Sequence, residues 1–383
     1  MSRVLPADLG LHILPCYARQ DVTFERGEGC WLVGDDGKRY LDFLAGIAVV
    51  GLGHCHPDVR EAAHAQLDRL WHASNLFWTT PMTELAERLS ARFGGAQAFF
   101  CNSGAEAIEA GLKYARKASG KPGIVALEGS FHGRTFGALS VTGQPAKWNG
   151  FGPLVPDVRF ARLNDAESLA AAAADGNVGC VLLEPIQGEG GINPATERFL
   201  ESAAKLAHGS GALLFFDEIQ CGLGRTGTFF AHEQLGIKPD VVSLAKGLAN
   251  GLPIGALLVS DEAAGGFSPG DHASTFGGNP VACAAACAVL DVLNDALLEN
   301  VRAMGELLSA GLAALPAVRE VRGAGLLLGC ELDRSAGTVM AACLEAGLVV
   351  GTAGEQVLRL TPPLVVTETE VDRALEILAE VLV

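Results

Sequence analysis

The middle of the chain repeats one pattern, in which a short apolar run is followed, in most cases, by a segment long enough to form a helix. Short apolar runs bounded by polar turns predict strands that are buried on both faces, and such strands belong to parallel sheets covered by helices. The runs that we assign to strands are residues 98–100, 124–127, 180–183, 212–216, 241–244 and 256–259. The pattern therefore predicts an α/β fold, with a large domain built on a mainly parallel central sheet that helices flank.

The segments before and after this region predict a smaller α+β domain. Apolar residues at 31–33 and 39–41 enclose a Gly-Asp turn, which is a hairpin signal. The C-terminal part is predicted as a helix at 297–315, strands within 318–331, a helix at 336–346, strands within 348–360 and a last helix from 368. We expect both segments to join in one domain. The predicted division is 1–56 for the N-terminal segment, 57–285 for the large domain and 286–383 for the C-terminal part.

The composition limits the partners and the compartment. The 383 residues include 28 basic and 44 acidic side chains, so the net charge is −16 and a polyanion would be repelled. No basic stripe with interleaved aromatic residues occurs, and we expect no nucleic-acid partner. The ten cysteines form no C-x-x-C pair, which is typical of reduced thiols in a cytoplasmic protein. The first 14 residues lack the pattern of a signal peptide, and the apolar stretch 280–290 is too short to span a membrane.

His54, Cys55 and His56 raise the question of a metal site, because two imidazoles two residues apart share one face of a strand. No second cluster of ligands is evident, and Pro57 favours a turn at this place. We therefore expect no metal.

Unusual polar residues follow several of the predicted strands, at the edge where open α/β sheets bind ligands. After the run at 98–100 comes Ser103-Gly104-Ala105 at the start of a helix, where free N–H groups and the positive end of the helix dipole favour a phosphate. An ordinary serine cap explains the same fragment.

Asp217 and Lys246 each follow a predicted strand directly or within two residues. A carboxylate at the end of a buried strand needs a cation or several donors, so Asp217 is suited to a protonated ring nitrogen, although a helix cap or a metal ligand is an alternative. Partial burial of Lys246 would free its amine to attack a carbonyl group, as a Schiff-base lysine requires. The alternative is a lysine whose stem packs while its amine reaches water.

Two arginines are candidate carboxylate ligands. Arginine binds a carboxylate through two parallel hydrogen bonds, which suits it to amino-acid substrates. Arg359 lies inside an apolar strand and needs a partner if it is buried. Arg134 lies in a glycine-containing turn, where a surface ion pair is the alternative.

These residues belong to motifs that run through nearly the whole chain. The motifs are GIAV at 46–49, GHCHP at 53–57, NSGAEA at 102–107, FHGRT at 131–135, EPIQGEGG at 184–191, DEIQ at 217–220, LAKG at 244–247, STFGGNP at 274–280 and RLTPPL at 359–364. In this order they resemble the class III aminotransferases of fold type I, and most closely the acetylornithine aminotransferases among them. The resemblance implies a fold type I transferase that uses pyridoxal 5'-phosphate.

The resemblance implies a role for each residue that matches a cofactor-binding position. Lys246 resembles the lysine that holds the cofactor as a Schiff base, and Asp217 resembles the partner of the pyridine nitrogen. The remaining cofactor contacts that it implies are Gln220 near the ring hydroxyl, Phe131 stacked on the ring, and Ser103, Gly104 and Ala105 at the phosphate. Thr275 resembles the residue that completes the phosphate site from the other subunit, which implies a homodimer with shared active sites.

For the substrates, Arg134 and Ser274 resemble contacts to acetylornithine, with Arg134 on its carboxylate. Arg359 resembles the arginine that binds the carboxylate next to the reacting carbon of glutamate or 2-oxoglutarate. Glu189 resembles the acid that masks this arginine when the other substrate is bound.

The reaction implied is transfer of the terminal amino group of N2-acetyl-L-ornithine to 2-oxoglutarate, a step of arginine biosynthesis. Within the same class, succinyldiaminopimelate, ornithine and 4-aminobutyrate aminotransferases are alternatives. Outside it, the alternatives are a catalytically silent binding protein that keeps the fold and a Schiff-base aldolase in a barrel. An aldolase needs neither the Ser-Gly-Ala phosphate seat nor Asp217.

Overall fold

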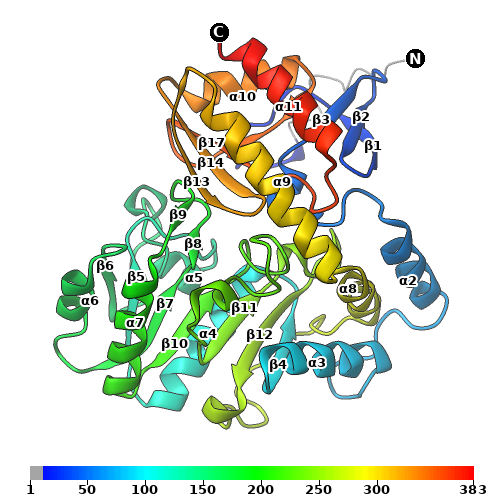
Figure 1. Ribbon diagram of the computed structural model, residues 1–383. Coiled ribbons are helices and arrows are strands. Elements are labelled where there is room, and N and C mark those ends of the chain that lie inside the picture. The colour runs from blue at the N-terminus through cyan, green and yellow to red at the C-terminus, as the bar shows by residue number, and fades with distance from the viewer. Residues whose placement is uncertain (1–11) are drawn as a thin grey trace.

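A seven-stranded sheet forms the centre of the molecule in the computed structural model, which describes residues 12–383 (Figure 1). Residues 1–11, which begin the predicted N-terminal segment and include most of the stretch that lacks a signal-peptide pattern, lie outside the described residues. In spatial order the strands are β4 (Ala96–Cys101), β12 (Gly255–Ser260), β11 (Val241–Leu244), β10 (Leu213–Asp217), β7 (Val178–Leu183), β5 (Gly123–Leu127) and β6 (Val158–Ala161). All six predicted runs form strands of this sheet, and the prediction of a mainly parallel sheet is confirmed.

Two features of the sheet were not predicted. The strand β12 is antiparallel to both of its neighbours, β11 and β4. Only residues 245–254 join β11 to β12, and this connection holds just the short helix η4 (Lys246–Ala249), which is too little chain for a helical crossover to a parallel strand. The edge strand β6 is short and only partly buried, and its Arg159 interrupts the apolar pattern.

Helices cover both faces of the sheet because successive strand residues point to opposite sides. On one side, α4 (Gly104–Ser119) and α5 (Phe136–Ser140) share a core with Phe215 of β10. On the other side, the next residue, Phe216, belongs to the core that contains α3, α6 and α7. These three helices span Thr80–Phe93, Ala166–Ala172 and Glu197–Ser210.

The helix α8 (Pro280–Val292) packs against both α3 and α2 (Pro57–Leu67). Its N-cap is Asn279, whose Oδ1 accepts hydrogen bonds from the backbone N–H groups of Val281 and Ala282. Within residues 12–383, no single helix has both the length and the apolar composition needed to cross a membrane. Only α8 taken together with α9 (Asp295–Ala313) meets that criterion, and the two are bent by 74° at their junction.

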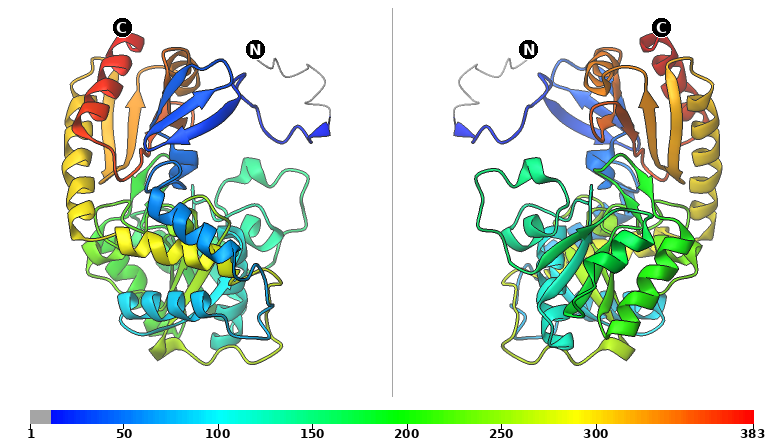
Figure 2. Two further views of the ribbon diagram at one scale, coloured as in Figure 1. Left: turned by 90° about the vertical axis from the view of Figure 1, so that its right-hand side faces the viewer. Right: turned by 90° about the vertical axis from the view of Figure 1, so that its left-hand side faces the viewer.

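The N-terminal and C-terminal segments meet in a second body of structure above the central sheet (Figures 1 and 2). The strand β3 (Arg39–Asp42) pairs in parallel with β15 (Leu348–Val349), where Leu41 lies opposite Leu348. One sheet holds β1 (Phe24–Glu28), β2 (Trp31–Gly34), β3 (Arg39–Asp42) and β15 (Leu348–Val349), and the other holds β13 (Val318–Ala324), β14 (Leu327–Leu332), β17 (Val357–Leu360) and β16 (Gly351–Thr352). The division into domains stays a prediction, and its boundary after residue 285 lies inside α8.

The remaining elements complete this arrangement. The helix α9 packs against β13, β14 and α11 (Glu368–Val381), while α10 (Ala336–Glu345) contacts β15 and β17. The predicted hairpin and the predicted C-terminal helices and strands are all present, with ends shifted by a few residues. The short elements are α1 (Ala45–Ala48), η2 (Pro145–Lys147), β8 (Ile186–Gln187), β9 (Asn193–Pro194), η3 (Ala231–Leu235) and η5 (Asp261–Ala263).

Candidate active site

A cavity of about 410 Å³ opens at the carboxyl ends of the central strands. The strand β10 ends there at Asp217, and Lys246 follows β11 after one residue. Most of the predicted site residues line this active-site cavity, namely Ser103, Gly104, Ala105, Phe131, Arg134, Glu189, Asp217, Gln220 and Lys246. The predicted residues outside its lining are Ser274, Thr275 and Arg359.

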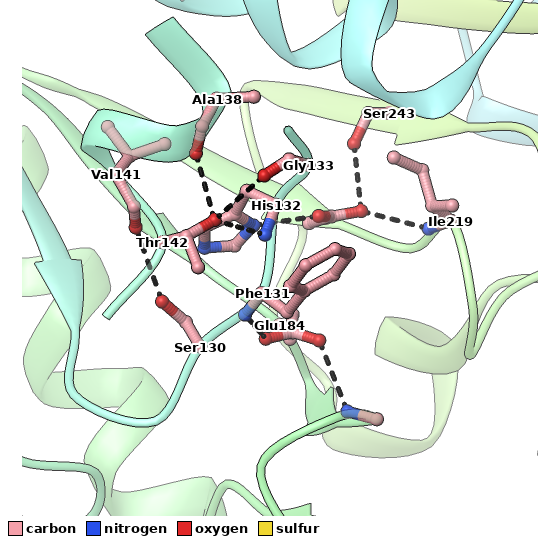
Figure 3. Close-up of polar contacts among 12 residues, drawn as sticks. Ser130, Phe131, His132, Gly133, Ala138, Val141, Thr142, Glu184, Ile219 and Ser243 are labelled. Carbon is pink, nitrogen blue, oxygen red and sulfur yellow. Dashed lines mark hydrogen bonds and ion pairs between the residues drawn. The ribbon is translucent and has the colours of Figure 1, made fainter. Parts of the chain in front are cut away.

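Asp217 is held by three contacts at the end of β10. Its Oδ2 lies 2.7 Å from Nδ1 of His132, and its Oδ1 accepts hydrogen bonds from the backbone N–H of Ile219 at 3.0 Å and from Oγ of Ser243 at 3.2 Å (Figure 3). The side chain is 4% exposed. Because a buried carboxylate is costly without such partners, this network fixes Asp217 at the floor of the cavity.

His132 and Glu184 also line the cavity, and no role was predicted for either. Nε2 of His132 is buried and has no hydrogen-bond partner among the described residues. Glu184 accepts hydrogen bonds from the backbone N–H groups of Phe131 at 3.0 Å and Gly188 at 3.1 Å (Figure 3). Burial raises the pKa of its carboxyl group to about 7. A signal was available for Glu184, because it follows β7 directly, as an acid at a strand end.

The start of α4 combines a serine cap with two free donors. Oγ of Ser103 accepts a hydrogen bond from the backbone N–H of Glu106 at 3.2 Å, as the cap interpretation requires. The N–H groups of Gly104 and Ala105 donate no hydrogen bond within residues 12–383. A Cβ atom at Gly104 would lie 2.7 Å from Cδ1 of Ile219, so glycine permits this close approach. The cap interpretation is therefore confirmed. The cap also leaves two N–H groups at the positive end of the helix for an anion, and phosphate binding there stays a prediction.

Lys246 lies in a left-handed backbone conformation, with φ of +39°, at the start of η4. Desolvation lowers the pKa of its amine to about 8, while the charge of Glu189 opposes this shift and that of Arg359 adds to it. A larger fraction of the amine is therefore uncharged near neutral pH than in an exposed lysine, which is the form that attacks a carbonyl carbon.

Arg359 is 3% exposed on β17 and has the partner that its burial demands. Its Nη1 forms an ion pair with Oε1 of Glu189 and donates hydrogen bonds to the carbonyl oxygen of Gly188 at 3.1 Å and to Oε1 of Gln220 at 3.3 Å. Burial raises the pKa of Glu189, but Arg359 outweighs it and holds that pKa below its ordinary value. Nε of Arg359 is buried without a partner among the described residues. Glu189 lines the cavity and Arg359 does not, so the carboxylate of Glu189 separates Arg359 from the cavity.

The other predicted substrate contacts lie nearer the surface. Arg134 lines the cavity, is exposed, and has its Cζ 5.6 Å from the centre of the Phe131 ring. Ser274 lies beside the cavity, and its Oγ accepts a hydrogen bond from Nδ2 of Asn102 at 3.1 Å. Thr275 is exposed and does not reach the cavity of its own chain.

His54, the first histidine of the His-Cys-His sequence, pairs with an acid. Its Nε2 lies 2.7 Å from Oδ2 of the buried Asp42. The following residue, Cys55, has φ of +53°, which is a turn conformation rather than a strand.

Similar proteins identify the family of the chain. The sequence model of the family described as class-III aminotransferases matches residues 16–382. The chain belongs to the class-III aminotransferases. Acetylornithine aminotransferase of Archaeoglobus fulgidus is 47% identical to this aminotransferase over 96% of the chain and 97% of the relative. Acetylornithine aminotransferase of Bacillus subtilis is 43% identical over 94% of each.

Solved structures agree with this assignment. Ornithine aminotransferase of Toxoplasma gondii has a TM-score of 0.93 and 32% identity, covering 97% of this aminotransferase and 93% of that chain. N-acetylornithine aminotransferase of Stenotrophomonas maltophilia has a TM-score of 0.84 and 38% identity, covering 95% and 96%. The predicted fold is confirmed, and this aminotransferase is a transaminase that depends on pyridoxal phosphate.

The residues of the cavity fit that cofactor. The free N–H groups of Gly104 and Ala105 suit its phosphate, and the buried carboxylate of Asp217 suits a protonated ring nitrogen. The amine of Lys246, with its lowered pKa, lines the same space and suits an aldehyde.

Proposed function

We propose that this aminotransferase transfers the terminal amino group of N2-acetyl-L-ornithine to 2-oxoglutarate, forming N-acetyl-L-glutamate 5-semialdehyde and L-glutamate, as a cytoplasmic step of arginine biosynthesis. The relatives that are named acetylornithine aminotransferases, at 43–47% identity, support this substrate. The free thiols of all ten cysteines support the reducing compartment.

Two arginines carry the proposal: Arg134, which lines the cavity, and Arg359, which lies outside the lining and is paired with Glu189. Acetylornithine has its carboxylate far from the reacting amine, whereas glutamate has a carboxylate on the carbon that reacts. An enzyme that places the reacting amine of both substrates at the same point needs two carboxylate-binding sites. The site that a given substrate does not use must then be blocked. Arg134 is exposed at the cavity, while Arg359 is covered by Glu189.

The cofactor supplies an electron sink and carries the amino group between the two substrates. In our proposal, Nζ of Lys246 binds the cofactor aldehyde at rest. Once a substrate amine had released it, Nζ would take the proton from the substrate carbon that bears the amino group and deliver it to the cofactor carbon that carried the aldehyde. With a keto acid, Nζ would move the proton in the opposite direction. Ping-pong kinetics follow from this order.

Asp217 would hold the proton on the cofactor ring nitrogen through its carboxylate, which His132 and Ser243 keep in place. Ser103 and the N–H groups of Gly104 and Ala105 would hold the phosphate, and Phe131 would support the ring. Gln220, which also contacts Arg359, would bind the ring hydroxyl.

We propose that the carboxylate of Glu189 blocks the guanidinium group of Arg359 through their ion pair. With acetylornithine in the cavity, the pair stays closed and the charge of Arg359 is neutralised. With glutamate or 2-oxoglutarate, the substrate carboxylate replaces that of Glu189 on the guanidinium group. Gln220 touches both members of the pair, with 3.4 Å between its Nε2 and Oε1 of Glu189, so it is placed to follow this exchange.

We also propose a homodimer in which Thr275 of each chain completes the phosphate site of the other. A broad exposed apolar patch supports it, formed by Leu70, Trp71, Leu76, Phe77, Trp78 and Phe276. Nδ2 of Asn75 donates to the carbonyl oxygens of Ser274 and Gly277, which joins the two segments of the patch. Light scattering on the cofactor-loaded protein tests this proposal, and a fully active monomer would refute it.

The substrate is tested by assaying the purified protein with 2-oxoglutarate and, side by side, acetylornithine, ornithine, succinyldiaminopimelate and 4-aminobutyrate. We expect the highest kcat/KM for acetylornithine. A higher value for any other donor would move the assignment to that member of the class. No turnover of any of the four would favour a silent binding protein.

Replacing Arg359 by Ala is expected to raise KM for 2-oxoglutarate by about 100-fold, because losing one partner of a buried charge pair costs about 2–5 kcal/mol. KM for acetylornithine is expected to change by about threefold or less, since that substrate does not use Arg359. Steady-state kinetics with each substrate varied in turn measures both values. Arg359→Lys is the control that keeps the charge but loses the planar fork. Equal rises for both substrates would contradict a selective clamp.

A further inference from the structure

Two cationic side chains, Arg134 and Lys147, lie against the ring of Phe131. Phe131 and Arg134 line the active-site cavity, and Lys147 stands just outside that lining. Cζ of Arg134 is 5.6 Å and Nζ of Lys147 is 5.7 Å from the centre of the Phe131 ring. Within residues 12–383, neither side chain has a hydrogen-bond acceptor or an acidic partner in contact. The acid whose charge acts on Lys147, Glu189, is itself bound to Arg359.

The turn that carries Lys147 is anchored on both sides of it. Nε2 of Gln144 donates to the carbonyl oxygens of Gly129 and Ser130, at 3.1 and 3.2 Å. Nε1 of Trp148 donates to the carbonyl oxygen of Thr142 at 2.8 Å. Gly129 and Ser130 lead directly into the segment that carries the aromatic ring. These hydrogen bonds therefore fix the backbone position of Lys147, in contrast to a lysine on an unanchored surface loop.

The energetics of this pair favour an anion beside it. Desolvation is the main cause that lowers the pKa of Lys147, and the positive charge of Arg134 lowers it further, while Glu189 opposes both. Two like charges held close together repel each other, and partial burial strengthens that repulsion. A carboxylate placed next to both cations would accept charge-assisted hydrogen bonds from each and remove the repulsion.

We propose that Lys147 is a further substrate-binding residue, which together with Arg134 takes the carboxylate at the far end of the amino donor. The inference rests on the proposed function, because it is the ω-amino donor that carries a carboxylate remote from the reacting amine. Lys147 thereby makes the cavity select donors with such a distal carboxylate. The family resemblance implied Arg134 for this carboxylate, and Ser274 as a further contact to acetylornithine.

The test compares two donors that differ only in the distal carboxylate. N-acetylputrescine has the chain of acetylornithine without that group. For Lys147→Met we expect kcat/KM for acetylornithine to fall about tenfold, which corresponds to ~1.4 kcal/mol. For N-acetylputrescine we expect less than about a twofold change. Lys205→Met is the matched control, because it removes the same charge from an exposed position on α7. It is expected to leave both donors unchanged.

A binding measurement separates this inference from the proposed function. N2-acetyl-L-norvaline keeps the distal carboxylate but lacks the reacting amine, so calorimetry can follow its binding without turnover. We expect about tenfold weaker binding to Lys147→Met than to wild type or Lys205→Met. Unchanged binding, or an equal loss with both donors, would overturn the role of Lys147. Failure of the wild type to turn over acetylornithine, with the norvaline result intact, would instead overturn the proposed function.

Discussion

Lys246→Ala is expected to lose transaminase activity by about 10⁴-fold while keeping its fold. Proton transfer by a positioned base contributes on the order of 10²–10⁴ in rate, and the variant also loses the amine that binds the cofactor aldehyde. The lysine side chain lines the active-site cavity rather than the core, and its left-handed backbone is no more strained with alanine than with lysine. Stability is therefore expected to stay near that of wild type.

Turnover of acetylornithine with 2-oxoglutarate measures the first effect, and thermal unfolding followed by circular dichroism measures the second. The variant is expected to bind the cofactor reversibly, because the N–H groups of α4 and the carboxylate of Asp217 remain, and dialysis is expected to remove it. Lys205→Ala, on the exposed side of α7, is the control and is expected to behave as wild type. Turnover of the Lys246→Ala protein above about a tenth of the wild-type rate would be incompatible with the role that we give to Lys246.

Asp217→Ala is expected to lower kcat by about 10²- to 10³-fold, because removing one partner of a buried charge pair costs about 3–5 kcal/mol. The loss arises in the reaction, where the ring nitrogen no longer keeps its proton, and the substitution also leaves His132 without its partner. Single-turnover absorbance changes on adding acetylornithine measure it directly.

Asp217→Asn separates the charge from the packing. An asparagine has nearly the shape of aspartate, and its side-chain oxygen can still accept from the backbone N–H of Ile219, but it has no charge with which to hold a proton on the ring. We expect the asparagine variant to be nearly as impaired as the alanine variant. If it kept more than half of the wild-type kcat, the charge of Asp217 would not be what the reaction needs.

The large features of the fold could be predicted because each depends on residues close together in the sequence. All six predicted strands of the central sheet are short runs of apolar residues, and every one is present. The edge strand β6 was missed because an edge strand is only partly buried and includes Arg159. The meeting of the two terminal segments depends on the pairing of β3 with β15, about 300 residues apart, which no local pattern reports.

The candidate site likewise contains residues that local sequence could reveal and residues that it could not. Asp217 and Lys246 could be found because each follows an apolar run, where the first charged residue is conspicuous. Arg359 could be suspected from its apolar strand, but its partner Glu189 lies 170 positions away. His132 was missed because its significance arises from Asp217, 85 positions away. Lys147 was missed because a lysine in a surface turn carries no signal until the neighbouring ring and arginine are seen.

The central claim is that Lys246 is the residue covalently joined to the cofactor. Borohydride reduction of the purified, cofactor-loaded protein, followed by proteolysis and mass spectrometry, tests it most directly. We predict that one peptide carries the mass of the reduced cofactor and that fragmentation places it on Lys246. A label on any other lysine, or no label on a protein that had visibly bound the cofactor, would contradict the claim.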